Sequence, residues 1–168
     1  MHDHFSRTYA FSNETYVHGI ALFTLLFDEI FGHVGIDAFS EAEKDAQVQH
    51  WRTIAEQMHV KDVPTTWAGM QQALRTYETS PDWYRRTPAG QRCAESLVGQ
   101  FNHRWLPRPL HPLGRALLLS LQHDHVLAAI GQPKPPAIVA RTVRVGMRLA
   151  LRLQQRTATR ANQSTHRH

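Results

Sequence analysis

Helix start and stop signals constrain the fold of this chain more than any other feature of its sequence. Ser12 and Asn13 are residue types that commonly cap a helix N-terminus, and they precede an apolar run at residues 16–31. Gly32 and Gly35 follow that run and are typical of a helix end. The signals therefore predict a first helix between these two boundaries.

The same kind of punctuation continues along the chain. Ser40 and Glu43 stand at capping-box spacing, Pro64-Thr65-Thr66 precedes another segment, and Thr87-Pro88 places proline at a first helical position. Proline-rich stretches at residues 106–112 and 133–136 break the chain, because proline is excluded from helix interiors. The predicted later helices cover residues 40–59, 67–78, 88–105, 113–130 with an interruption near Asp124, and 137–156.

No run of alternating apolar and polar residues indicates a strand, so the sequence predicts an all-α fold. The chain has 168 residues, of which 42% are hydrophobic, and this is enough for one packed domain. We expect a short N-terminal arm at residues 1–12, a single helical domain at 13–157 and a disordered basic tail at 158–168.

The single cysteine, Cys93, excludes an internal disulfide and any cysteine-based metal site, and it suits a reducing compartment. We expect Cys93 to be a small core or boundary residue. The first residues lack the pattern of a secretory leader, and the apolar run is too short, and at Asp28 and Glu29 too charged, for a bilayer span. These features predict a cytoplasmic protein.

The net charge of +5 is very unevenly distributed. Residues 134–168 hold eight Lys/Arg and no acidic residue, whereas the rest of the chain holds eleven Lys/Arg against 14 Asp/Glu. This pattern does not indicate a nucleic-acid-binding protein. A helical stripe of arginines either solvates the outside of a last core helix or contacts an anionic membrane peripherally. Its members are Arg141, Arg144, Arg148, Arg152 and Arg156.

The chain has 12 histidines, but it lacks nucleotide-binding glycine loops, the zinc-protease motif and a nucleophile elbow. His123 and His125 are two residues apart and would not share a helix face, so we do not expect a chelating pair. His18 differs because apolar residues flank it early in the first helix. It is either a satisfied core histidine or an axial haem ligand, with Gly19 leaving room for a flat macrocycle.

Several motifs, in their order and spacing, resemble the MpaB/rubber-oxygenase (latex-clearing protein) family. The resemblance covers roughly residues 13–153. The matching motifs are Gln-His-Trp-Arg at 49–52, Met-His-Val-Lys-Asp-Val-Pro at 58–64, Tyr77-Glu78, Trp-Leu-Pro-Arg-Pro-Leu at 105–110, Asp124, Pro133, Pro135-Pro136 and Arg141.

The resemblance implies a globin-like helical bundle with haem b, an oxidoreductase that uses dioxygen to cleave double bonds in a hydrophobic, isoprenoid-like substrate. It also implies His18 as the haem ligand, and it assigns no further catalytic residue. We expect the chain to correspond to the C-terminal portion of the family's domain and to lack its N-terminal helices. The alternative is a non-catalytic helical module that binds a lipid surface or a protein through its C-terminal arginine helix.

Overall fold

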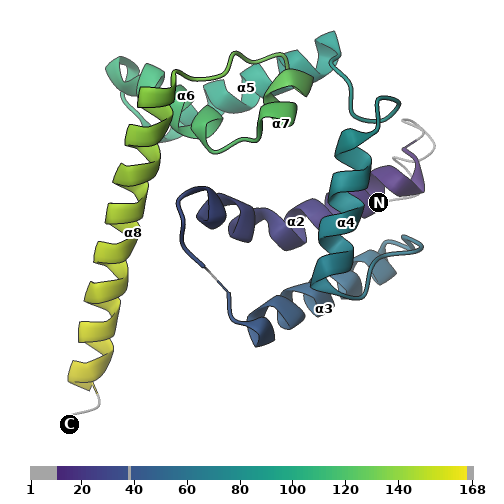
Figure 1. The fold of residues 1–168 in the computed structure, drawn as a ribbon, viewed down its shortest axis with the longest axis horizontal. Coiled ribbons are helices and arrows are strands. Elements are labelled where there is room, and N and C mark those ends of the chain that lie inside the picture. Colours follow the sequence, from purple (N-terminus) through teal and green to yellow (C-terminus); the bar gives the residue numbers. More distant parts are fainter. Residues whose placement is uncertain (1–10, 38, 166–168) are drawn as a thin grey trace. The chain divides into compact units, whose positions relative to one another are not determined.

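The computed structural model describes residues 11–37 and 39–165, with side chains up to Gln154. Every regular element in these ranges is a helix, which confirms the all-α prediction (Figure 1). The helices form two compact units, one made of residues up to 32 together with 37–85, the other of residues 33–36 and those from 86 onward. The single domain expected at residues 13–157 stays a prediction, and residues 1–10 of the expected arm lie outside the described range.

The first unit contains α2 (Asn13–His33), α3 (Glu41–Gln57) and α4 (Trp67–Thr79). One apolar core joins these three helices, and each fully buried aliphatic side chain in it contributes about 1.5–3 kcal/mol. The core residues are Ile20, Ala21 and Leu25 of α2, Val48 and Ala55 of α3, and Met70 and Leu74 of α4. One face of α2 is therefore buried in this core, while Phe23 and Phe27 remain exposed.

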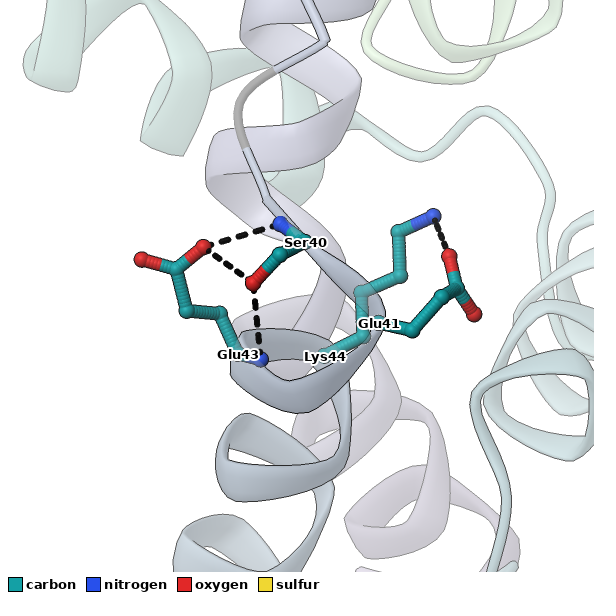
Figure 2. Close-up of polar contacts among 4 residues, drawn as sticks. All are labelled: Ser40, Glu41, Glu43 and Lys44. Atoms are coloured by element: carbon teal, nitrogen blue, oxygen red, sulfur yellow. Dashed lines mark hydrogen bonds and ion pairs between the residues drawn. The ribbon is translucent and has the colours of Figure 1, made fainter.

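α3 begins with the predicted capping box (Figure 2). The Glu43 amide donates to Ser40 Oγ over 3.4 Å, and the Ser40 amide donates to Glu43 Oε2 over 2.8 Å. Two backbone donors that the helix start would leave unpaired are thereby satisfied. Because all the groups lie within four residues, the start of α3 is fixed by local sequence.

The turn between α3 and α4 is held to the start of α2. α3 ends with His59 in the left-handed region at φ 58°, where the Val60 amide donates to the Ala55 carbonyl. Asn13 then bonds both backbone groups of Lys61, with Nδ2 to the carbonyl at 3.0 Å and Oδ1 from the amide at 2.9 Å. This clamp places the first turn of α2 beside the loop that leads into α4.

The second unit contains α5 (Pro88–Trp105), η1 (Arg108–Leu110), α6 (His111–Ser120), α7 (Asp124–Ala129) and α8 (Ala137–Thr165). Its buried side chains come from all four α-helices. They include Ala94 and Val98 of α5, Leu119 of α6, Leu127 of α7 and Ala140 of α8. Gly114 permits the close approach of α5 to α6, because a Cβ at that position would meet the Asn102 and Leu106 side chains.

The structure differs from the predicted elements in three places. α6 starts at His111, within the predicted break. Pro112 lies in its first turn, where a backbone N–H would have no helical partner, so the N–H that proline lacks costs no hydrogen bond. The predicted interruption near Asp124 is a turn that separates α6 from α7. α8 continues to Thr165, past the predicted end near Arg156, so most of the expected tail is described as helix and residues 166–168 lie outside the described range.

Candidate functional site

His18 lies on α2 within the first unit, and its side chain is 14% exposed. Its imidazole stacks on the phenol ring of Tyr77 from α4, with 4.2 Å between ring centroids and 18° between ring planes. The Tyr77 hydroxyl lies 3.2 Å from Thr15 Oγ1, within hydrogen-bond distance. Because Thr15 is on α2, α2 and α4 hold the tyrosine at both ends and thereby fix the plane of the imidazole.

A carboxylate faces one nitrogen of the same imidazole. Glu78 Oε1 is 3.5 Å from His18 Nε2, and the Glu78 side chain is only 9% exposed. Nε2 is buried and makes no hydrogen bond of good geometry to any group that the structure describes. The His18 imidazole is thus held beside a mostly buried carboxylate, and its Nε2 is left without a hydrogen-bond partner.

Tyr84 completes this group of side chains. Its ring centroid is 6.0 Å from that of His18 and 6.4 Å from that of Tyr77. Burial, together with the negative charge of Glu78 and the neighbouring Tyr77, raises the pKa of Tyr84 to about 12. Tyr84 is therefore a neutral phenol throughout the physiological range.

His18 and Tyr77 line a pocket of about 550 Å³ within the first unit. This volume lies within the usual range of small-molecule sites. α2 supplies Asn13, Glu14, Val17 and His18, α4 supplies Gly69, Gln72, Ala73, Thr76 and Tyr77, and the flanking loops supply Asp62, Ser80 and Trp83. Of the apolar run at residues 16–31, only Val17 and His18 line this pocket.

Sequence patterns single out His18 but assign no functional role to the residues that surround it. Tyr77 and Glu78 belong to the family motifs, and nothing in the sequence marks Tyr84. Local periodicity cannot reveal these contacts, since Thr15 and Tyr77 are 62 residues apart. The one available signal was the Tyr77-Glu78 pair itself, an aromatic residue next to an acid at the end of an amphipathic helix.

The arginine stripe on α8 is only partly available to a partner. Arg141, Arg144 and Arg152 are exposed. Arg148 instead donates through Nε to the Val34 carbonyl, and its guanidinium occupies the space beside Gly35. The side chain of Arg156 lies outside those that the structure describes.

One other sequence expectation is wrong. Cys93 is exposed on α5 and is neither a core nor a boundary residue. His123 and His125 stack, with ring centroids 5.5 Å apart, because His123 precedes α7 and is not bound by helical spacing. That these two histidines form no chelating pair stays a prediction. His2, His4, His166 and His168 lie outside the described residues.

A comparison with protein families gives one match. Residues 1–152 match the model described as "ER-bound oxygenase mpaB/B'/Rubber oxygenase, catalytic domain". The chain belongs to this family. The match confirms the resemblance and extends it ahead of Asn13, whereas the expectation that the chain lacks the family's N-terminal helices stays a prediction.

A comparison with curated proteins finds no match to this chain. Among the described residues, no helix combines the length and apolar character that crossing a membrane requires.

Proposed function

We propose that this chain is a haem-dependent oxygenase that acts on a hydrophobic, isoprenoid-like substrate, with His18 as the axial ligand of haem b. Membership of a family described by its oxygenases supports the class of reaction. The observation that carries the proposal for this chain is the position of His18, which lies on the wall of a pocket and has its ring plane fixed by Tyr77.

The residues around His18 fit such a cofactor. A histidine that binds a metal through one ring nitrogen usually has a carboxylate or carbonyl beside the other, which orients the ring and makes it more basic. Glu78 is a mostly buried carboxylate with Oε1 3.5 Å from Nε2, so the iron would be held through the other ring nitrogen, Nδ1. Gly19, next to His18, would leave room for a flat macrocycle, since no atom beyond its chain neighbours and the backbone of its own helix lies within 4 Å of the position that a Cβ would take there.

Haem iron, when bound, would supply activation of dioxygen. The cleavage balances without a further reductant, because one oxygen atom of O₂ goes to each carbon of the broken double bond and two carbonyl groups result. The chain's own residues would bind and orient the substrate. Val17, Ala73 and Trp83 offer apolar contacts for a hydrocarbon chain, and neutral Tyr84 beside His18 contributes no charge to the site.

The proposal is tested with the full chain expressed with haem supplied and incubated with a polyisoprenoid under air. We expect carbonyl-ended cleavage products whose oxygen atoms derive from ¹⁸O₂, and none without dioxygen. His18→Ala should abolish the products. His50→Ala is the matched control, since His50 is an exposed histidine of α3 outside the pocket. Absence of products from haem-loaded protein would contradict the oxygenase proposal.

An anionic lipid surface is a second candidate partner, favoured by the outward face of α8. Four large aliphatic side chains on this face are exposed and lie at helical spacing, namely Ile138, Val145, Leu149 and Leu153. Exposed arginines at 141, 144 and 152 flank this apolar stripe, and α8 contains no acidic residue. An apolar face bordered by cations is typical of helices that lie in a membrane interface.

Vesicle co-sedimentation tests the lipid proposal. We expect the full chain to sediment with vesicles that contain phosphatidylserine and to stay in solution with pure phosphatidylcholine. The double variant Leu149→Gln/Leu153→Gln should weaken sedimentation, whereas Leu97→Gln, at an exposed leucine of α5, should not. Equal sedimentation with both lipids would contradict this second proposal and leave the first untouched.

A further inference from the structure

A second pocket, of about 350 Å³, lies in the second unit where the start of α8 meets α6 and α7. It shares no residue with the pocket at His18. Its floor includes Leu119 of α6, Leu127 of α7 and Ala140 of α8, all of which are buried. The pocket therefore offers an apolar surface beside the N-terminus of a long helix.

The helix start contributes unpaired amides. The Ala140 amide donates to the Pro136 carbonyl over 3.0 Å, so the amides of residues 137–139 precede the first intrahelical hydrogen bond of α8. Proline at position 136 has no polar side chain with which to cap them. Ala137 lines the pocket, so the positive end of the helix dipole lies at its wall.

A buried hydroxyl provides an independent sign of a ligand. Ser120 lines the same pocket and is 4% exposed, and its Oγ has no hydrogen-bond partner among the residues that the structure describes. A buried hydroxyl without a partner is destabilising. A bound group that accepts a hydrogen bond from Ser120 would remove this cost.

The charges in the pocket favour an anion. Lys134 and Asp124 both line it, but they neutralise each other through a contact of 2.6 Å between Nζ and Oδ2. Lys134 also lowers the pKa of Asp124, so this carboxylate stays ionised and paired. Arg144 lines the pocket too, and it makes no ion pair or hydrogen bond within the described part of the chain. One positive charge is left uncompensated.

We propose that this pocket binds a phosphate monoester that carries a short apolar group. The phosphate would meet Arg144, the first amides of α8 and the Ser120 hydroxyl, and the apolar group would contact Leu119 and Leu127. A guanidinium and a helix N-terminus are both frequent phosphate-binding groups. The ligand could be a free alkyl phosphate or the headgroup of a phosphomonoester lipid, and these two sources share the same chemistry.

Titration calorimetry on the full chain at physiological ionic strength tests the site with butyl phosphate, inorganic phosphate and butanol. We expect saturable binding of butyl phosphate, weaker binding of inorganic phosphate and none of butanol. Arg144→Gln should raise the Kd for butyl phosphate about tenfold or more, as the loss of a charge-assisted hydrogen bond does. Arg141→Gln is the matched control, since Arg141 is exposed one turn earlier and does not line the pocket. The Kd of Arg141→Gln for butyl phosphate should change by less than about twofold, because exposed charges are screened.

Ser120→Ala is a second test variant, and it removes no hydrogen bond of the fold, because Ser120 Oγ has no partner there. We expect this variant to bind butyl phosphate several-fold more weakly. Vesicles that contain phosphatidic acid distinguish the two sources. If the lipid headgroup is the ligand, butyl phosphate displaces the chain from these vesicles, and Ser120→Ala binds them more weakly. If the ligand is a free phosphate monoester, butyl phosphate binds the pocket but displaces no chain from the vesicles, which the arginines of α8 alone would hold. The proposal is overturned by the absence of saturable butyl phosphate binding, or by equal weakening in Arg144→Gln and Arg141→Gln.

Discussion

The imidazole of His18 lies face to face with the phenol ring of Tyr77, 4.2 Å between centroids and 18° from parallel. His18 is on α2 and Tyr77 on α4, so the stacked pair also joins two helices of the first unit. The stack fixes the ring plane, and Glu78 faces Nε2. The sequence leaves His18 as either a core histidine or a haem ligand, and the proposed function depends on this relationship.

The stack itself should contribute to stability. We expect Tyr77→Leu to lower the free energy of unfolding by about 1 kcal/mol beyond the loss of buried area, because an aromatic contact is worth about 0.5–1.5 kcal/mol. Tyr77→Phe keeps the stack and loses only the hydroxyl contact with Thr15, so its effect should be smaller. Urea denaturation followed by circular dichroism measures both. A Tyr77→Phe variant as unstable as Tyr77→Leu would show that the hydroxyl, and not the ring, carries the contact.

The phenol of Tyr84 should titrate late. Its pKa is about 12 in the folded chain and about 10 in the unfolded chain, so folding favours the protonated phenol. The contribution of the Tyr84 phenol to the free energy of unfolding is fully present below about pH 10 and is lost as the pH rises toward 12. Phenolate absorbance during alkaline titration should show a component with this delayed pKa that is absent from Tyr84→Phe. Glu78→Gln should bring that pKa down, because the carboxylate charge helps raise it.

The capping box of α3 predicts a local loss of stability. Ser40→Ala removes the oxygen that accepts from the Glu43 amide, and such substitutions cost about 1 kcal/mol. Thermal unfolding of the full chain should show the decrease. Ser80→Ala is a matched control, because Ser80 follows the end of α4 and its hydrogen bonds there are made by backbone groups, which the substitution keeps. A loss as large in the control would contradict the role given to the cap.

The same capping box should make the start of α3 sensitive to acid. Hydrogen bonds from the Ser40 hydroxyl and amide lower the pKa of Glu43 in the folded chain. This contribution is therefore present above the ordinary glutamate pKa and is lost as the pH falls through the lowered one. Comparing wild type with Glu43→Gln across this acidic range measures the effect. If the two proteins lost stability in parallel, the carboxylate would have no part in it.

Gly35 should not tolerate a side chain. It has φ +70°, a backbone conformation that side chains disfavour, and a Cβ there would overlap the Arg148 guanidinium. We expect Gly35→Ala to cost about 1–2 kcal/mol from the backbone alone, plus the cost of displacing Arg148. In the background of Arg148→Ala, the same substitution should cost only the backbone part. Equal costs in both backgrounds would contradict the packing of Arg148 against Gly35.

The sequence predicted what depends on neighbouring residues and missed what depends on distant ones. Ser40, Thr66 and Thr87 cap their helices through contacts within three residues, so pattern alone located α3, α4 and α5. Helical spacing places Arg148 in the arginine stripe. It does not reveal the partner of this side chain, the Val34 carbonyl, which lies 114 residues away. The roles of Tyr77, Glu78 and Tyr84 depend on how α4 packs on α2, which no local signal encodes.

The absorption spectrum of the full chain, expressed with haem supplied, tests the central claim most directly. We predict a Soret band from stoichiometric haem that is lost in His18→Ala, restored to that variant by added imidazole, and retained in His50→Ala. Glu78→Gln should keep the band but shift it, since the carboxylate beside the imidazole sets its basicity. A chain that binds no haem, or one whose Soret band is unchanged in His18→Ala, would contradict the account.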